Sequence, residues 1–564
     1  MSSKFPTWTK KINAKQIRGR DFLGIQNPGN RIMGELMPAL TGATKHPRFY
    51  SFFSWAISAS RTLGGSKNPK EQDDFLFRME NLLLYCSGLH KKHRYSMTGC
   101  RVGAMSREAS VDSFLAKGSP RLPLIVKQID RETSAFNEQN YRPSMNEMHL
   151  FRPGRFWKLS KERGQRLAEA FSASIVGIHG KLEELAKADY VSRSEATKLA
   201  EHLCPCVLEG AEQKLLRSLI LEGLGNPDSY DLQRRSSLIW LLESVSNAAE
   251  ADDPSWEYPE KMYFRGVRPG NGENWSTARK TSEAWALFHM RTLLQIGVTG
   301  LWSSFLKHLE QLPGQEAAVE DVVRGMVCDL EKSGYLGKII AGVEPRKALA
   351  MSVGDLLLKL TGESFHPGDG PPVNDLLAVI AMAKKRGLKP GSSFIETAIN
   401  ERLDVAYTNA SQFAVATESL FLLLALVVRW APLDESGWES GGSLSEGGQE
   451  RLSLRTIQQD MFEHMGDTLE EMLNFVMRRY VVDQHFLFAT RKQTNTYHFV
   501  GGDRGIALRS AREGNWTSAN YINAALQMLH ALGLLDGGVG GEGYSLSKLG
   551  GNLLKEELAR SNGT

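Results

Sequence analysis

The chain has 564 residues, of which 41% are hydrophobic and 23% are charged, and its formal net charge is +4. This composition is that of an ordinary soluble globular protein and excludes a fibrous or largely disordered chain. The five cysteines are too few and too scattered for a disulfide framework, and the first residues lack the apolar core of a secretory signal. These features predict a cytoplasmic protein.

The positive charge is concentrated toward the amino terminus. Residues 1–166 contain 29 Lys and Arg against 13 Asp and Glu, a balance of +16, whereas the remaining 398 residues contain 39 against 51, a balance of −12. A basic block of this size attracts phosphate backbones, and its charges repel one another in the absence of an anionic partner. We therefore predict that the protein binds DNA, without strong sequence preference.

Residues 1–170 are predicted to form a basic helical domain that closes in a winged helix. Asn27–Asn30 breaks the chain before an apolar-periodic run, and helices are indicated over Phe49–Leu63 and Asp73–His90. Cationic clusters lie beside aromatic residues there, a mixture suited to contacts with the phosphate backbone. The candidate DNA-binding residues, two of which lie near the carboxy terminus, are Lys10, Lys11, Lys15, Arg18, Arg20, Lys45, Arg48, Lys91, Lys92, Arg94, Arg152, Arg155, Arg509 and Arg512.

Residues 171–431 are predicted to form an α-helical middle domain. Apolar residues recur with helical period over Ser192–Leu203, Ala211–Leu224, Ser282–Leu312 and Ala318–Lys332. The apolar run Ser419–Val428 is much shorter than the roughly 20 residues that span a membrane, so we expect a buried helix and no membrane partner. Residues 432–450 are rich in Gly, Ser and Glu, which predicts a flexible linker.

Residues 451–564 are predicted to form a winged-helix domain. The expected elements are helices over Leu454–Glu463 and Leu469–Tyr480, strands around Gln484–Thr490 and Thr496–Gly501, and a helix over Asn520–Leu535. A glycine-dense hairpin at Asp536–Gly543 and a helix that Ser547 can cap come next. This order of elements resembles that of a winged helix-turn-helix, which implies a DNA-binding fold whose hairpin is the wing.

The last part of this predicted winged helix, a strand followed by a capped helix, occurs twice in the chain. The pattern L-S-K-x-x-G-x-x-L is present at Leu159–Leu167 and at Leu546–Leu554, where it aligns Gly164 with Gly551. We therefore expect a second winged-helix unit at the end of the basic domain, although the stretch Asn140–Phe156 before it shows no clear recognition helix. Winged helices also serve as protein-interaction modules. The second copy has few cations in its recognition helix, so we expect it to dock a partner more than to bind DNA.

No catalytic motif is present. The sequence lacks a phosphate-binding P-loop, a serine-hydrolase elbow and the H-E-x-x-H zinc motif. The stretch His202–Cys206 contains one His and two Cys, but no second pair of ligands follows at zinc-finger spacing. We expect these cysteines to pack at a helix end that Pro205 terminates. The sequence thus predicts no catalytic residue, no metal and no cofactor.

The predicted fold class is mainly α, a multi-domain helical protein with one or two winged-helix units. We expect a non-enzymatic scaffold subunit that binds DNA and holds other protein subunits on its acidic middle. This layout resembles that of the non-ATPase DNA-binding subunits of bacterial condensin-like or anti-phage defence complexes, which implies chromosome maintenance or antiviral defence. Two alternatives stay open: a nuclease or nucleic-acid-modifying subunit with a site assembled from distant residues, and a winged-helix transcription regulator.

Overall fold

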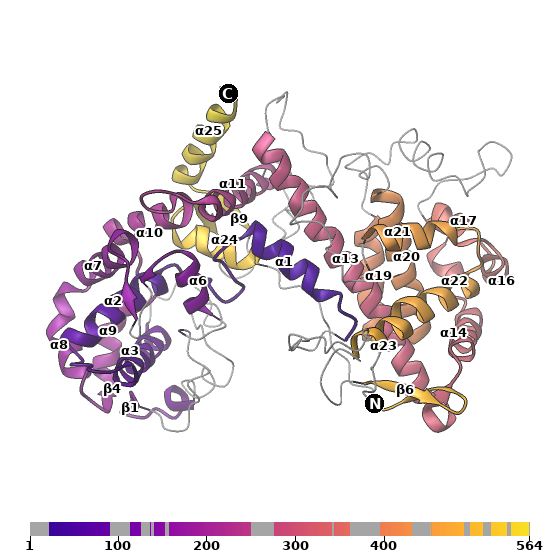
Figure 1. Cartoon of the computed structure of the whole chain (residues 1–564), viewed down its shortest axis with the longest axis horizontal. Helices are drawn as coiled ribbons and strands as arrows, with labels where there is room; N and C mark the ends of the chain where they lie inside the picture. Colours follow the sequence, from indigo (N-terminus) through magenta and orange to yellow (C-terminus); the bar gives the residue numbers. More distant parts are fainter. Residues whose placement is uncertain are drawn as a thin grey trace, which may run out of the picture. The chain divides into compact units, whose positions relative to one another are not determined.

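Helices dominate the structure, which confirms the predicted mainly α class (Figure 1). The computed structural model describes residues 22–90, 113–125, 136, 140–152, 157–249, 276–340, 343–360, 395–430, 452, 454–489, 497–510, 521–537 and 543–562. Within these ranges no helix is both long enough and apolar enough to cross a lipid bilayer.

The chain is divided into two compact units, each of which contains two separate stretches of sequence. The central unit comprises residues 1–31 and 287–518, and the repeat-bearing unit comprises residues 32–286 and 519–564. The carboxy-terminal residues 519–564 thus pack with residues 32–286, a grouping different from the four consecutive segments that the sequence predicted. The linker predicted at 432–450 lies outside the described residues.

The repeat-bearing unit is built around α2 (Arg48–Thr62), which packs against α3, α7 and α10. Phe49, Phe52 and Phe53 on α2 are all buried and contact other rings of the core in tilted and edge-to-face arrangements. The other helices are α3 (Pro69–Leu89), α6 (Tyr141–Glu147), α7 (Arg166–Ser174), α8 (His179–Leu185), α9 (Arg193–Leu203), α10 (Gly210–Glu222), α11 (Ser229–Ala249), α24 (Ile522–Ala531) and α25 (Lys548–Asn562).

Short antiparallel strand pairs connect the helices of this unit. The pairs are β1 (Arg121–Pro123) with β4 (Tyr190–Ser192), β2 (Phe151–Arg152) with β3 (Lys158–Leu159), and β8 (Leu535–Gly537) with β9 (Tyr544–Leu546). A π-helical turn over Lys161–Gln165 precedes α7, and a 3₁₀ turn over Val176–Ile178 follows it.

The central unit has α20 (Gln412–Trp430) in its core. Residues Leu420–Leu426 of α20 are all buried, which confirms the buried helix predicted at Ser419–Val428, and α19 packs against it. The other helices are α14 (Val319–Ser333), α15 (Tyr335–Ile339), α16 (Pro345–Leu349), α17 (Val353–Leu360), α19 (Ile395–Thr408), α21 (Leu454–Glu463), α22 (Leu469–Val476) and α23 (Gln484–Ala489). A 3₁₀ turn covers Pro313–Gln315 and a π-helical turn covers Met477–Asp483.

One small antiparallel sheet completes the central unit. Its strands lie in the order β5 (Glu316–Ala317), β7 (Gly505–Leu508) and β6 (Phe499–Gly502). Helices α1 (Gln26–Leu36) and α13 (Ser276–Gln311) have residues in both units.

Two local predictions are wrong. Asn27–Asn30 does not break the chain, because these residues form the first turn of α1. Pro28 is tolerated there, since the backbone N–H groups of the first turn have no partner within the helix and the one that proline lacks is not missed. The stretch Gln484–Thr490 does not form a strand, because residues 484–489 continue as α23 directly from the preceding π-helical turn. The helices predicted over Phe49–Leu63 and Asp73–His90 are confirmed as α2 and α3.

Glu243 should make the stability of the repeat-bearing unit depend on pH. This α11 residue is 7% exposed, and burial raises the pKa of its carboxyl from 4.5 to about 7. The folded chain therefore binds the proton more tightly than the unfolded chain, and stability falls as the pH rises from about 4.5 to about 7.

We expect Glu243→Gln to raise the free energy of unfolding by about 3 kcal/mol at pH 8 and to have little effect at pH 4. Urea denaturation of both proteins at each pH measures the difference. Glu344→Gln, at an exposed position, is the control. Equal stability of the Glu243 variant and the parent at pH 8 would contradict the prediction.

Candidate functional site

Two stretches of the repeat-bearing unit share one architecture. The first repeat runs from α6 through the β2–β3 hairpin to α7, and the second runs from α24 through the β8–β9 hairpin to α25. Both hairpins have the same register, because Phe151 pairs with Leu159 in the first and Leu535 pairs with Leu546 in the second. The first repeat does contain a helix before its hairpin, α6, which the sequence pattern did not indicate.

The helix before each hairpin ends in the same way. His149 (φ 54°) and Gly533 (φ 76°) both take the left-handed conformation. The next residue then donates its backbone N–H back to the helix: Leu150 to the Met145 carbonyl at 2.9 Å, and Leu534 to the Leu529 carbonyl at 2.9 Å. This is the Schellman pattern of helix termination, and it directs each chain into its first strand.

The helix after each hairpin also begins in the same way. Ser160 and Ser547 accept a hydrogen bond at Oγ from the backbone N–H of Gly164 and Gly550, respectively, each at 3.0 Å. A Cβ atom at either glycine would overlap the carbonyl oxygen of the residue that leads into the first strand, Leu150 or Leu534. The equivalent of Gly164 is thus Gly550, not Gly551 as the sequence motif aligned them, because the π-helical turn adds one residue to the first repeat.

The two hairpins differ in charge. Arg152 lies directly opposite Lys158 in the first hairpin, whereas the matching pair in the second is Asp536 and Ser545. Lys161 and Arg166 follow the first hairpin, and all four cations are exposed. We call Arg152, Lys158, Lys161 and Arg166 the basic hairpin patch.

Little negative charge balances the basic hairpin patch. Glu162 approaches Arg152 at 3.9 Å, the outer limit of an ion pair. Lys158, Lys161 and Arg166 form no ion pair with any residue that the structure describes. The patch therefore presents unneutralised positive charge on a two-stranded hairpin and the helix turn beside it.

Comparison of the chain with family models, curated proteins and solved structures finds no match. The candidate interface therefore rests on the geometry of this chain alone.

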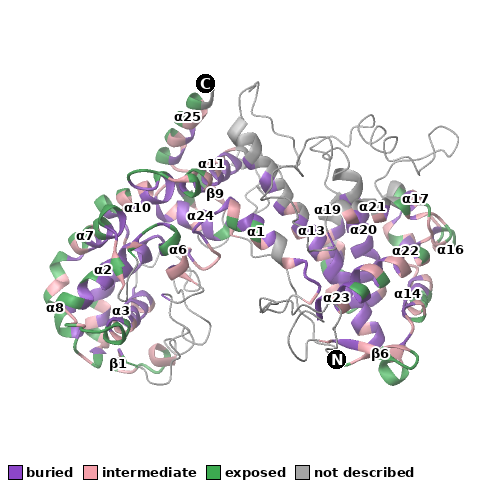
Figure 2. Ribbon diagram, viewed as in Figure 1, coloured by how far each residue is buried: buried purple, intermediate pink, exposed green. Residues whose placement is uncertain are grey.

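The helix α24 of the second repeat is held inside its unit. Seven of its ten residues are buried, and Figure 2 shows it as one of the most buried helices of the unit. On α10, Gln213 donates a hydrogen bond to the Ala531 carbonyl at 2.9 Å and Arg217 donates one to the Leu532 carbonyl at 3.0 Å. Since α24 packs on its own unit, most of its surface is unavailable to a DNA groove.

The other predicted DNA-binding residues have mixed positions. The prediction that Arg48 binds phosphate is wrong, because this residue is 2% exposed and is paired with buried Glu212. Lys45 is half-buried and Arg509 is exposed. Lys10, Lys11, Lys15, Arg18, Arg20, Lys91, Lys92, Arg94, Arg155 and Arg512 lie outside the described residues.

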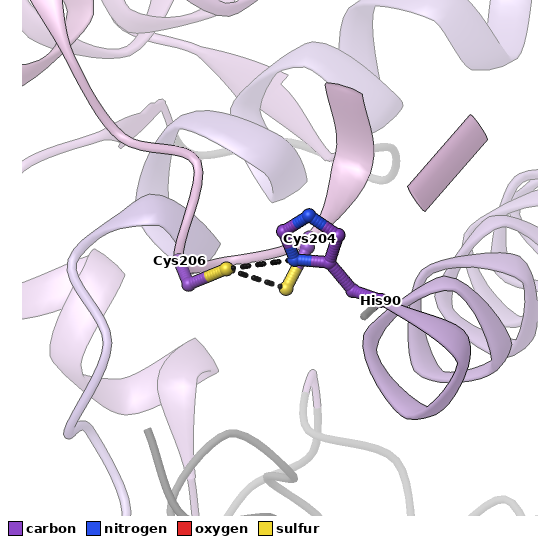
Figure 3. A group of neighbouring side chains, drawn as sticks. All are labelled: His90, Cys204 and Cys206. Atoms are coloured by element: carbon purple, nitrogen blue, oxygen red, sulfur yellow. Dashed lines mark hydrogen bonds between the residues drawn. The ribbon is translucent and has the colours of Figure 1, made fainter. Parts of the chain in front are cut away.

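A second cluster has the chemistry of a metal site. Cys204 and Cys206 lie beside His90, and one ligand atom from each is within 4.8 Å of the others (Figure 3). The sequence had suggested His202, which is exposed and does not belong to the cluster. His90 precedes Cys206 by 116 residues, so no local spacing motif could have found it.

Proposed function

We propose that the protein is a non-enzymatic scaffold subunit that binds DNA through the backbone phosphates, with the basic hairpin patch as one contact surface. The observation that supports this most is the cross-strand pair of Arg152 and Lys158. Like charges placed directly opposite on a hairpin destabilise it. An anion bound between them removes this repulsion.

The chemistry of the patch favours phosphates over bases as the groups that are bound. Lysine and arginine on a hairpin and an adjoining helix turn can follow a phosphate backbone, and such contacts fix position without reading sequence. The first repeat has the helix, hairpin and helix order of a winged helix, with Arg152 and Lys158 of the patch on its hairpin. DNA binding without strong sequence preference follows from this arrangement.

The second repeat supports a different role within the same proposal. Its hairpin carries Asp536 in place of a cation, and α24 is buried on α10 and α11. We assign this repeat to packing and to the docking of partner subunits. A cytoplasmic complex for chromosome maintenance or antiviral defence is the setting that the charge division and the layout suggest.

The test is a salt titration of duplex DNA binding. Replacement of all four patch residues by glutamine should make the slope of log K against log salt less steep by about 0.9 for each phosphate that the variant no longer neutralises. The matched control replaces four exposed cations of the central unit, Arg324, Lys332, Arg346 and Lys347, by glutamine. A second variant neutralises Lys10, Lys11, Lys15, Arg18 and Arg20, which tests the predicted amino-terminal contacts.

Equal slopes for the patch variant and the control would exclude the patch from the interface. Incubation of the parent protein with plasmid DNA, linear DNA and RNA in Mg²⁺ separates the classes of function. A mobility shift without cleavage supports the scaffold, and cleavage supports the nuclease alternative.

A further inference from the structure

Three side chains from two distant segments converge at one point in the repeat-bearing unit (Figure 3). His90 follows the last residue of α3, and Cys204 follows the last residue of α9. The Nδ1 atom of His90 lies 3.1 Å from Sγ of Cys206, and the two sulfur atoms lie 3.0 Å apart. A disulfide bond would bring the sulfur atoms to about 2.05 Å, so both residues are thiols here.

We propose that His90, Cys204 and Cys206 bind a Zn²⁺ ion and supply three of the four ligands of a tetrahedral site. Imidazole nitrogen and thiolate sulfur are ligands that zinc takes in proteins. In a tetrahedral site with Zn–S bonds of about 2.3 Å, two ligand sulfur atoms are about 3.8 Å apart. An outward movement of the Cys206 side chain by less than about 1 Å brings the two sulfur atoms to that separation.

The backbone around the cysteines is fixed by local sequence and by one buried arginine. Pro205 restricts Cys204 to an extended conformation, which ends α9 and turns both thiols to the same side. Arg48 on α2 donates a hydrogen bond to the Cys204 carbonyl at 2.7 Å. The loop is therefore held before any metal binds, which lowers the entropic cost of forming the site.

The helix ends favour a cation at this point. Both α3 and α9 terminate at the cluster, and the carboxy-terminal end of a helix carries partial negative charge. The two helices pack against each other along their lengths, so both ends act on the same site. A divalent ion there also compensates for the charge of the two thiolates.

The second nitrogen of His90 has the partner expected for a zinc-bound imidazole. Nε2 lies 3.5 Å from a carboxylate oxygen of Glu201. A carboxylate at this position holds the proton on Nε2 and leaves Nδ1, the nitrogen that faces Cys206, to bind the metal. We expect Glu201→Gln to weaken zinc affinity roughly 10- to 100-fold.

The ion has a structural role because it joins two distant segments. Cys204 is fully buried and His90 is 8% exposed, whereas Cys206 is only partly buried. The ion joins segments separated by 116 residues, and a link between such distant segments restricts the unfolded chain strongly. Removal of the ion should therefore loosen the packing of α3 against the loop after α9.

The experiment measures metal bound to the full-length protein purified under reducing conditions. We expect one zinc per chain by elemental mass spectrometry, and thiolate-to-cobalt charge-transfer bands after replacement of zinc by Co²⁺. Cys204→Ser with Cys206→Ser, and His90→Gln alone, should lose the ion. The matched controls are Cys328→Ser and His202→Ala, which alter an exposed cysteine and an exposed histidine outside the cluster.

A second measurement uses the parent protein and does not depend on the folding of any variant. Cys206, which is partly exposed, should resist alkylation until a chelator is added, while Cys328 reacts at the same rate throughout. Failure of the parent to bind zinc or Co²⁺, or unchanged alkylation of Cys206 on chelation, would overturn the proposal. Retention of zinc by the double cysteine variant would do so as well.

Discussion

Arg48→Met should lower the free energy of unfolding by about 3–5 kcal/mol, because it leaves the buried carboxylate of Glu212 without its cation. The Arg48 side chain is 2% exposed and that of Glu212 is 1% exposed, with Nε and Oε1 3.4 Å apart. The Ser51 hydroxyl donates a further hydrogen bond to Glu212 at 2.5 Å. One hydroxyl cannot replace the missing positive charge, so the unfolding equilibrium shifts strongly.

Chemical denaturation with a helical signal as the readout measures this change. Arg346→Met is the control, because Arg346 is 89% exposed in its pair with Glu331 and should change stability by at most about 1 kcal/mol. The double variant Arg48→Met with Glu212→Met should recover part of the stability, since an apolar pair leaves no buried charge. A destabilisation by Arg48→Met as small as that of the control would refute the pairing.

Asp231→Asn should be similarly destabilising, at about 3–5 kcal/mol, because it removes one negative charge from between two buried cations. Asp231 bonds Arg163 at 2.8 Å and Arg234 at 2.5 Å, and all three side chains are at most 7% exposed. The asparagine has the same shape but leaves two buried guanidinium groups uncompensated. The effect should reach the first repeat, because Arg163 also donates a hydrogen bond to the Met148 carbonyl at 3.1 Å.

The same substitution at an exposed pair isolates the contribution of burial. Asp321→Asn breaks a pair with Arg324 in which both side chains are more than half exposed, and it should change stability by less than about 1 kcal/mol. Thermal denaturation of both variants in one buffer gives the comparison. Matching melting temperatures for the two variants would show that the buried cluster carries no more energy than a surface pair.

The sequence allowed prediction of elements whose apolar residues repeat on one face. Helices such as α9 and α14 follow that pattern, because each buries a continuous stripe against its neighbours. The short run Gln484–Thr490 predicts a strand, but α23 continues from the π-helical turn before it. In such short apolar runs, contacts with the rest of the fold decide whether a helix or a strand forms.

The candidate sites could be predicted only in part, for a related reason. The motif at Leu159 and Leu546 located both repeats because the serine cap is a local requirement, but it aligned Gly164 with Gly551 instead of Gly550. The pairing of Arg48 with Glu212 spans 164 positions, so the local pattern indicates only a surface cation in a basic segment. Nothing in a local pattern distinguishes a cation that binds a distant carboxylate from one that faces solvent.

The π-helical turn at Lys161–Gln165 places one residue more between serine and glycine in the first repeat than in the second. The wider turn takes up that residue, so serine and glycine keep the same hydrogen bond in both repeats. The two repeats thus keep one backbone geometry while their sequences differ in length at this point and in the charge of the hairpin. The backbone of this module therefore tolerates a change of length that a sequence motif of fixed spacing does not.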